Sequence, residues 1–172
     1  MKKVLIIVGI VLVVGGLGGF LFWQDYKSGA LETGELPAVG QEFEDEGREH
    51  IAVGAEHKSY ATNPPTSGPH YAEPAAWGAY VSNLPDEQLI HNLEHGGIWI
   101  SYKDIDEDTK AKLQDIARAR PGGVILTPRE ANDAKIVLAS WRRMEKLEMF
   151  DRDKIETFIK HNINKSPEPL AR

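Results

Sequence analysis

The chain has 172 residues, no cysteine and a formal net charge of −6 at pH 7. This length fits one domain with appendages. Without cysteine there are no disulfide bonds and no thiolate metal ligands. The acidic charge argues against binding to nucleic acid or to anionic lipid head groups. We therefore expect a fold stabilised by an ordinary hydrophobic core, with no nucleic-acid partner; protein partners are unknown from the sequence.

The N-terminus has the pattern of a membrane anchor. Two lysines precede an uncharged run of 19 residues from Val4 to Phe22, long enough to cross the hydrocarbon core as a helix. The lysines place the N-terminus in the cytoplasm. A cleaved signal peptide is the competing interpretation, although its apolar core is usually shorter and no clear cleavage site follows the run. We predict a retained transmembrane anchor over residues 1–23 of a single-pass cell-membrane protein, with its C-terminal domain extracytoplasmic.

Three further regions follow the anchor. Residues 24–46 are polar and acidic with little apolar periodicity, which is typical of a spacer. Residues 47–165 are expected to form the extracytoplasmic domain, with the folded part starting near Val39, and residues 166–172 an irregular tail.

The first half of the domain contains fewer regular elements than the second. A short strand is expected from His50 to Val53, followed by an ordered irregular loop over 61–79, which is rich in proline and glycine. A helix is expected to begin at Pro85, with acidic residues in its first turn, and to stop at Gly96-Gly97.

The second half alternates strands and helices. Strands are expected at 98–102, 124–126 and 135–141, the last with a helical alternative, and 146–150 is expected to pair with it. Residues 106–120 and 151–163 have the apolar faces of amphipathic helices. The predicted class is α+β, with a mixed, mainly antiparallel sheet and flanking helices.

Two motifs contain three of the six histidines. The proline motif, Asn-Pro-Pro-Thr-Ser-Gly-Pro-His, covers residues 63–70, and the histidine motif, His-Asn-Leu-Glu-His-Gly-Gly, covers residues 91–97. His91 and His95 are four residues apart, a spacing that places both side chains on one face of a helix and also on one face of a strand. The prolines before His70 restrict φ in the loop that leads to it, which limits how far its side chain can move. These side chains are therefore able to converge.

Zinc and copper(II) both accept neutral imidazole nitrogens, and zinc typically takes three or four protein ligands. We predict a site for one of these metals at His70, His91 and His95, with His50 as the fourth candidate ligand. Glu94 is expected to lie next to the ligands and to fix the tautomer of an imidazole.

Two alternatives remain open. In the first, the histidines are hydrogen-bonded within a non-catalytic envelope interaction or structural domain, with Thr66 and Ser67 as natural partners. In the second, His-x-x-Glu-His is an inverted zincin motif of a zinc-dependent hydrolase, with Glu94 as general base. The short helix and the brevity of that motif count against it. We rank metal binding first and catalysis third, so that an enzyme is the less favoured outcome.

Both motifs resemble those of family 3105 of the domains of unknown function. The resemblance extends to 47–51, Tyr60, 139–141 and the helix around Phe158, about residues 40–165 in all. It implies a bacterial or archaeal protein with one N-terminal membrane span and an exported domain, and no transferable activity. The residues that it matches are His50, His70, His91, Glu94 and His95, whereas His57 and His161 are unmatched. This chain has Trp141-Arg142-Arg143 where members often have Trp-Gly-Arg.

Overall fold

The computed structural model describes residues 36–171, and a compact unit begins at Pro37. The predicted transmembrane anchor and most of the predicted spacer lie outside the described residues. Within residues 36–171, no helix is both long and apolar enough to cross a membrane.

A six-stranded sheet forms the centre of the unit, in the order β1-β8-β7-β5-β6-β4. The pairs β5–β6 and β4–β6 are parallel and the other three pairs are antiparallel. This arrangement confirms the predicted α+β class and the mixed, mainly antiparallel sheet. The strands are β1 (Gln41–Glu42), β4 (Gly78–Ala79), β5 (Ile98–Tyr102), β6 (Val124–Pro128), β7 (Ile136–Ser140) and β8 (Arg143–Leu147). A separate parallel ribbon pairs β2 (His50–Ile51) with β3 (His70–Tyr71).

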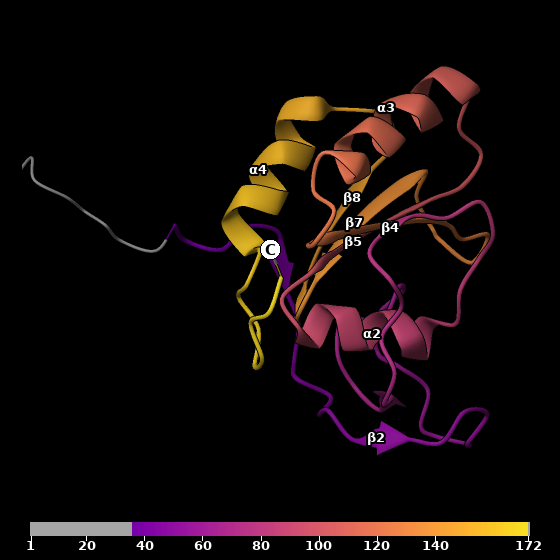
Figure 1. The fold of residues 1–172 in the computed structure, drawn as a ribbon, viewed down its shortest axis with the longest axis vertical. Coiled ribbons are helices and arrows are strands. Elements are labelled where there is room, and N and C mark those ends of the chain that lie inside the picture. Colours follow the sequence, from indigo (N-terminus) through magenta and orange to yellow (C-terminus); the bar gives the residue numbers. More distant parts are fainter. Residues whose placement is uncertain (1–35, 172) are drawn as a thin grey trace, which may run out of the picture. The chain divides into compact units, whose positions relative to one another are not determined.

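The two faces of the sheet carry different helices, α3 (Glu107–Arg118) and α4 (Arg152–Asn162) on one and α2 (Asp86–Glu94) on the other (Figure 1). Successive side chains of a strand point to opposite faces. Accordingly, Ile98 and Ile100 pack in the core under α3 and α4, whereas Trp99 packs with the buried leucines of α2. The α2 face is the one that carries the histidine motif.

The helices begin and end close to the predicted residues for identifiable reasons. The side chains of Asp106 and Asp151 accept hydrogen bonds from the third backbone N–H that follows each of them, which caps α3 and α4. Helix α2 begins after Pro85, and Gly96 follows its end with a φ of +85° that side chains rarely tolerate. The glycine pair therefore ends this helix as predicted.

Four strand predictions differ from the structure in extent, and the one at 124–126 is extended to Pro128 in β6. The segment predicted at 135–141 is a strand and not a helix, limited to β7 (Ile136–Ser140). All five of its residues are buried, which explains their continuous apolar run. Its partner β8 begins at Arg143 instead of 146, because Arg142 adopts a φ of +60° in a two-residue turn. The strand predicted at 50–53 is limited to His50–Ile51 and pairs with β3 outside the main sheet.

A buried arginine joins the start of the proline motif to the start of α2. Arg129 donates through Nε and Nη2 to the two carboxylate oxygens of Asp86, at 2.9 and 2.7 Å. Its Nη1 donates to Asn63 Oδ1 at 2.6 Å and to Asn132 Oδ1 at 3.0 Å. Because Asp86 opens α2 and Asn63 opens the proline motif, this side chain fixes the two histidine-bearing segments relative to each other.

Replacing this arginine is expected to destabilise the domain. Arg129→Met leaves a carboxylate and two amides without their partner, and we expect the free energy of unfolding to fall by about 2–4 kcal/mol. Arg129→Lys keeps the charge but not the two-pronged geometry, so it recovers part of this loss. Urea unfolding followed by circular dichroism measures both. Lys146→Met, at an exposed pair with Asp133, is the control, with a change of less than about 1 kcal/mol. Equal losses at the two positions would contradict this assignment.

Candidate metal centre

Five ionisable side chains from three separate segments meet beside α2. Parallel pairing places His50 of β2 opposite His70 of β3. His91 and Glu94 lie on α2, and His95 follows the helix directly, so the four-residue spacing brings His91 and His95 together. Helix α2 lies between the main sheet and β2 (Figure 1). We call these five residues the histidine cluster.

The rings of the cluster are in contact. Ring centroids are 4.9 Å apart for His50 and His70, 5.1 Å for His50 and His91, 5.2 Å for His70 and His91, and 4.4 Å for His91 and His95. Two sets of three potential ligands have ligand atoms within 4.8 Å of one another: His50, His70 and His91, and His91, Glu94 and His95. His70 and His95 thus belong to different sets, which share His91.

Backbone carbonyls determine the tautomers of the two buried histidines. His70 Nδ1 lies 2.8 Å from the Gly68 carbonyl oxygen, and His91 Nδ1 lies 2.7 Å from that of Tyr71. Because a carbonyl oxygen only accepts, each Nδ1 must carry the proton and donate it. In a neutral ring, Nε2 then holds a free lone pair, which is the form that ligates a metal. Both Nε2 atoms point to other members of the cluster.

Glu94 lies on the Nε2 side of the histidines. Its Oε2 is 3.1 Å from His70 Nε2 and 3.8 Å from His50 Nε2. If His70 is neutral with its proton on Nδ1, a nitrogen lone pair faces a carboxylate oxygen at 3.1 Å, and neither atom has a hydrogen to donate. Burial lowers the pKa of His70, against the opposing effect of its bond to Gly68, so a second proton on this ring is disfavoured. The contact therefore requires a positive charge between the two atoms, which either a shared proton or a metal ion supplies.

His95 lies at the other end of the cluster, under the C-terminal tail. Its Nε2 is 3.1 Å from His91 Nε2 and 3.7 Å from Glu168 Oε2. Burial, and then the neighbouring His91, lower the pKa of His95. The tail is irregular, as predicted, but backbone N–H groups of Glu168 and Leu170 donate to the carbonyl oxygens of Glu94 and His95. These bonds satisfy orphan carbonyls at the end of α2. No periodicity marks Glu168 in the sequence, and its position was not predicted.

The remaining residues of the histidine motif set the backbone around the cluster. The Asn92 side chain bonds both the N–H and the carbonyl of Ala75, each at 2.9 Å, which holds the loop beyond β3. A Cβ at Gly96 would come within 2.7 Å of Asn164 Oδ1, and one at Gly97 within 2.4 Å of the Trp77 ring. Both glycines are therefore required for close packing.

The polar residues of the proline motif hold the loop itself. Ser67 Oγ accepts the Glu46 N–H at 3.0 Å, and the Thr66 carbonyl oxygen accepts the Arg142 N–H at 2.9 Å. Gly68 has a φ of +119° and packs against the Tyr60 ring. The Thr66 hydroxyl lies 3.5 Å from that of Thr62. The histidines thus contact backbone carbonyls in place of the Thr66 and Ser67 hydroxyls that the hydrogen-bonded alternative expected.

The other two histidines lie outside both sets of ligands. His57 Nε2 pairs with Glu87 Oε1 at 3.2 Å, and His161 Nδ1 contacts the Pro37 carbonyl oxygen at 2.7 Å. They provide matched controls for substitutions in the cluster.

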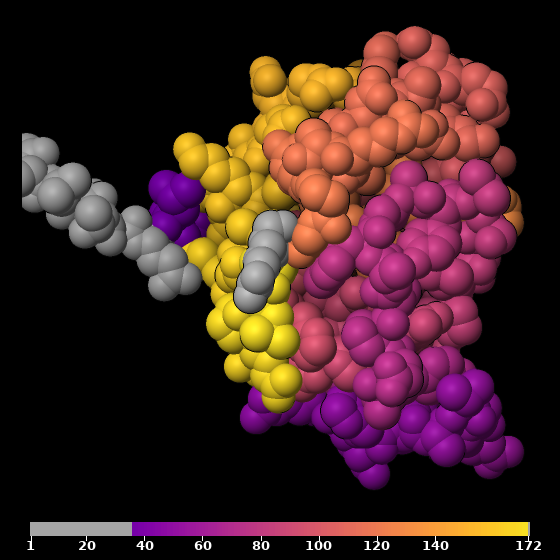
Figure 2. All heavy atoms as spheres, viewed as in Figure 1, coloured from indigo at the N-terminus to yellow at the C-terminus, as the bar shows by residue number. Residues whose placement is uncertain are grey.

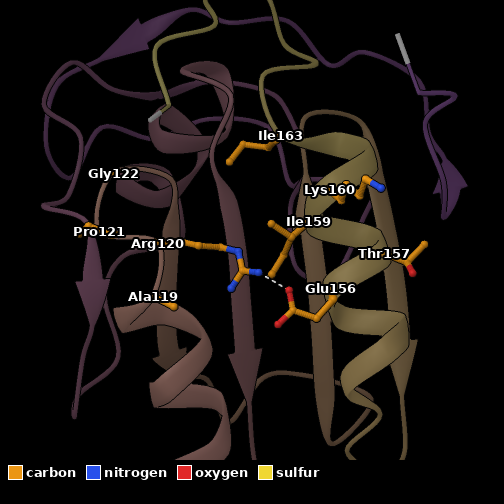
Figure 3. Close-up of a pocket in the computed structure, with 9 residues that line it drawn as sticks. All are labelled: Ala119, Arg120, Pro121, Gly122, Glu156, Thr157, Ile159, Lys160 and Ile163. Atoms are coloured by element: carbon orange, nitrogen blue, oxygen red, sulfur yellow. Dashed lines mark hydrogen bonds and ion pairs between the residues drawn. The ribbon is translucent and has the colours of Figure 1, made fainter. Parts of the chain in front are cut away.

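A cavity of about 860 Å³ lies between the end of α3 and helix α4 (Figure 3). An ion pair between Arg120 and Glu156 crosses it. No member of the histidine cluster is among its lining residues, which are Ala119, Arg120, Pro121, Gly122, Glu156, Thr157, Ile159, Lys160 and Ile163. The cavity and the histidine cluster are separate features of the described domain.

The fold and the cluster together define an α+β domain with a potential histidine-rich metal site. The chain belongs to the family described as "Protein of unknown function (DUF3105)", whose model matches residues 52–172. This confirms the family resemblance; His70, His91, Glu94 and His95 lie within the match, and His50 lies just before it. No curated protein and no solved structure matches the chain. The family description names no activity, so function must be argued from the cluster.

The ion pair of His57 predicts a pH-dependent stability. Hydrogen bonds to the Lys58 carbonyl and to Glu87 raise the pKa of His57 above its usual value of 6.5. Protonated His57 therefore stabilises the folded state fully below pH 6.5, and this contribution is lost as the pH rises through the raised pKa. His57→Gln should therefore lower the melting temperature more at about pH 5.5 than at about pH 8.5. The underlying loss in the free energy of unfolding is at most ~1 kcal/mol. An equal difference at both pH values would refute this role of the pair.

Proposed function

We propose that this chain is a membrane-anchored, extracytoplasmic domain that binds a transition metal, zinc or copper(II), at the histidine cluster. His70, His91 and Glu94 act as buried ligands, and His50 and His95 as ligands at the two more exposed ends. In this proposal Glu94 contacts the ion directly, because its carboxylate lies beside Nε2 of His70. The tautomers of His70 and His91 are fixed by the carbonyls of Gly68 and Tyr71.

The contact between His70 Nε2 and Glu94 Oε2 is the observation that carries the proposal. With the His70 proton held on Nδ1, two acceptor atoms face each other at 3.1 Å in a buried site, which is costly unless a proton or a metal ion lies between them. Neighbouring ligands around a tetrahedral zinc at ~2.0–2.1 Å lie roughly 3.3 Å apart. His91 Nε2 and His95 Nε2, 3.1 Å apart, have nearly the same spacing. Both spacings are therefore close to what a tetrahedral zinc requires of two neighbouring ligands.

The types of donor atom support the choice of metal. Imidazole nitrogens with one carboxylate oxygen suit zinc and copper(II), whereas copper(I) prefers sulfur ligands. The chain has no cysteine, and each of the buried rings donates its second nitrogen to a backbone carbonyl. That outer contact is usual for a metal-bound histidine.

The cellular location is supported by the sequence of the N-terminus. The uncharged run after Lys2 and Lys3 supports a single membrane span with a cytoplasmic N-terminus. The acidic domain would then face the extracytoplasmic side, where no reducing thiol pool competes for the metal.

Two alternatives make different claims about Glu94. A hydrolase requires this carboxylate to face a metal-bound water as a base, whereas its contacts with His70 and His50 support a ligand role. A purely hydrogen-bonded cluster requires a proton shared between His70 and Glu94, and no ion. Metal loading therefore separates metal binding and the hydrolase, which both need an ion, from the purely hydrogen-bonded cluster, which needs none.

The proposal predicts a defined stoichiometry. The full-length chain, purified in mild detergent, stripped with a chelator and reloaded with Zn²⁺ or Cu²⁺, should retain about one ion per chain by elemental mass spectrometry. Loading should raise the melting temperature, because an ion that binds the folded state stabilises it by mass action. His91→Ala should lose the ion, since His91 belongs to both sets of ligands.

His161→Ala removes a histidine outside the cluster and should retain the ion. His95→Ala, at a partly exposed side chain, provides a milder second variant if His91→Ala does not fold, and it should weaken binding. Wild-type protein that stays free of both metals after reconstitution would overturn the proposal.

A further inference from the structure

The ligands of the proposed site are anchored to very different degrees. His70, His91 and Glu94 are 0%, 4% and 3% exposed, and both rings are tied through Nδ1 to backbone carbonyls. The His50 side chain is 51% exposed. Within the described residues, its side chain makes no hydrogen bond, and Oε2 of its ion-pair partner Glu94 lies 3.8 Å away, which is too long for one. The His50 ring is therefore the least constrained member of the cluster.

The backbone that carries His50 is tied on one side to the proline motif, through the Gly47 and Glu49 carbonyls, and lies outside the main sheet. Strand β2 has two residues and belongs to a two-stranded ribbon apart from the main sheet. Residues 52–56 after it are exposed, including Val53 at 83%. The segment around β2 forms the outer surface at one end of the described domain, drawn in indigo (Figure 2). Segments with few buried contacts open locally at low cost in free energy.

His95, the other partly exposed ligand, is more restricted. Its side chain is 20% exposed and lies beside Glu168. The tail that carries Glu168 is attached through backbone hydrogen bonds to the end of α2. Access to the ion is therefore easier on the His50 side.

We propose that His50 is the exchangeable ligand of this site: the ion enters and leaves on the His50 side, where an external imidazole-type nitrogen replaces His50. The inference rests on the proposed metal-binding function. In the exchange, the bond from the metal to His50 Nε2 breaks as a bond to the external nitrogen forms. One neutral nitrogen donor replaces another, so neither a proton nor an electron is transferred. The site would thus pass its ion to a partner that presents a histidine.

The packing of the His50 ring gives the incoming donor a defined place. His50 stacks on His91 with an interplanar angle of 10°. When His50 swings outward, the face of His91 remains available for another flat ring. A free imidazole can fill the same place in a variant that lacks the His50 side chain, whereas the enclosed position of His70 offers no entry from solvent.

The test measures how fast the zinc-loaded full-length chain loses its ion to an excess of a chromogenic chelator. His50→Ala should release zinc roughly tenfold faster than wild type or more, the scale on which groups around a metal affect its retention. Adding imidazole should slow the release from His50→Ala toward the wild-type rate. His161→Ala should release zinc at the wild-type rate, and imidazole should not restore retention in His70→Ala.

Cobalt(II) loading gives a second readout that does not depend on the His70 variant. Imidazole should shift the visible absorption of cobalt-loaded His50→Ala toward the wild-type spectrum. Release from His50→Ala at the wild-type rate, or no effect of imidazole on its rate and its spectrum, would overturn the inference while leaving the metal site intact. A wild-type chain that binds no ion would overturn the proposed function as well.

Discussion

The hydrogen bonds from Nδ1 of His70 and His91 to backbone carbonyls are the constraint on which the site depends. They fix both rings, choose one tautomer for each, and direct two Nε2 lone pairs toward Glu94 and His95. Because the acceptors are main-chain atoms, the chemistry of the site depends on the conformation of the loop. A small shift of that loop would release the rings and leave Glu94 as a buried charge.

The rest of the domain keeps this loop in place. Arg129 attaches its first residue, Asn63, to the start of α2, and the N–H of Arg142 bonds to the carbonyl of Thr66. On the helix side, Asn92 holds the backbone of the loop that follows β3. The sheet is thereby a rigid support for α2, whereas β2, with the half-exposed His50, lies on the outer side of the cluster. Buried ligands on the rigid side and a loosely held ligand on the outer side fit a site that binds an ion without trapping it.

Sequence reasoning predicted the parts that carry a strong local signal. The three helices have apolar faces and capping aspartates or a terminal glycine pair, and β5, β6 and β7 are continuous apolar runs. The two-residue strands β1, β3 and β4 have no periodicity to detect, because pairing partners far away in the chain create them. Likewise, the start of β8 depends on the left-handed Arg142, which no local preference favours.

The same distinction applies to the site. The two motifs contain four of the five members of the cluster, since four-residue spacing and restricted turns are visible in the sequence. His50 lies outside both motifs and entered as the candidate fourth ligand. The carbonyl acceptors at Gly68 and Tyr71 were not predictable, because every residue has a carbonyl and its direction depends on the fold. Glu168 lies in an irregular tail, and its position beside His95 depends on tertiary hydrogen bonds.

X-ray absorption spectroscopy of the zinc-loaded full-length chain tests the central claim most directly. The account predicts a first shell of nitrogen and oxygen atoms at ~2.0–2.1 Å, with the outer-shell scattering of about four imidazole rings. A shell of oxygen atoms without imidazole scattering would place the zinc outside the histidine cluster and contradict the account.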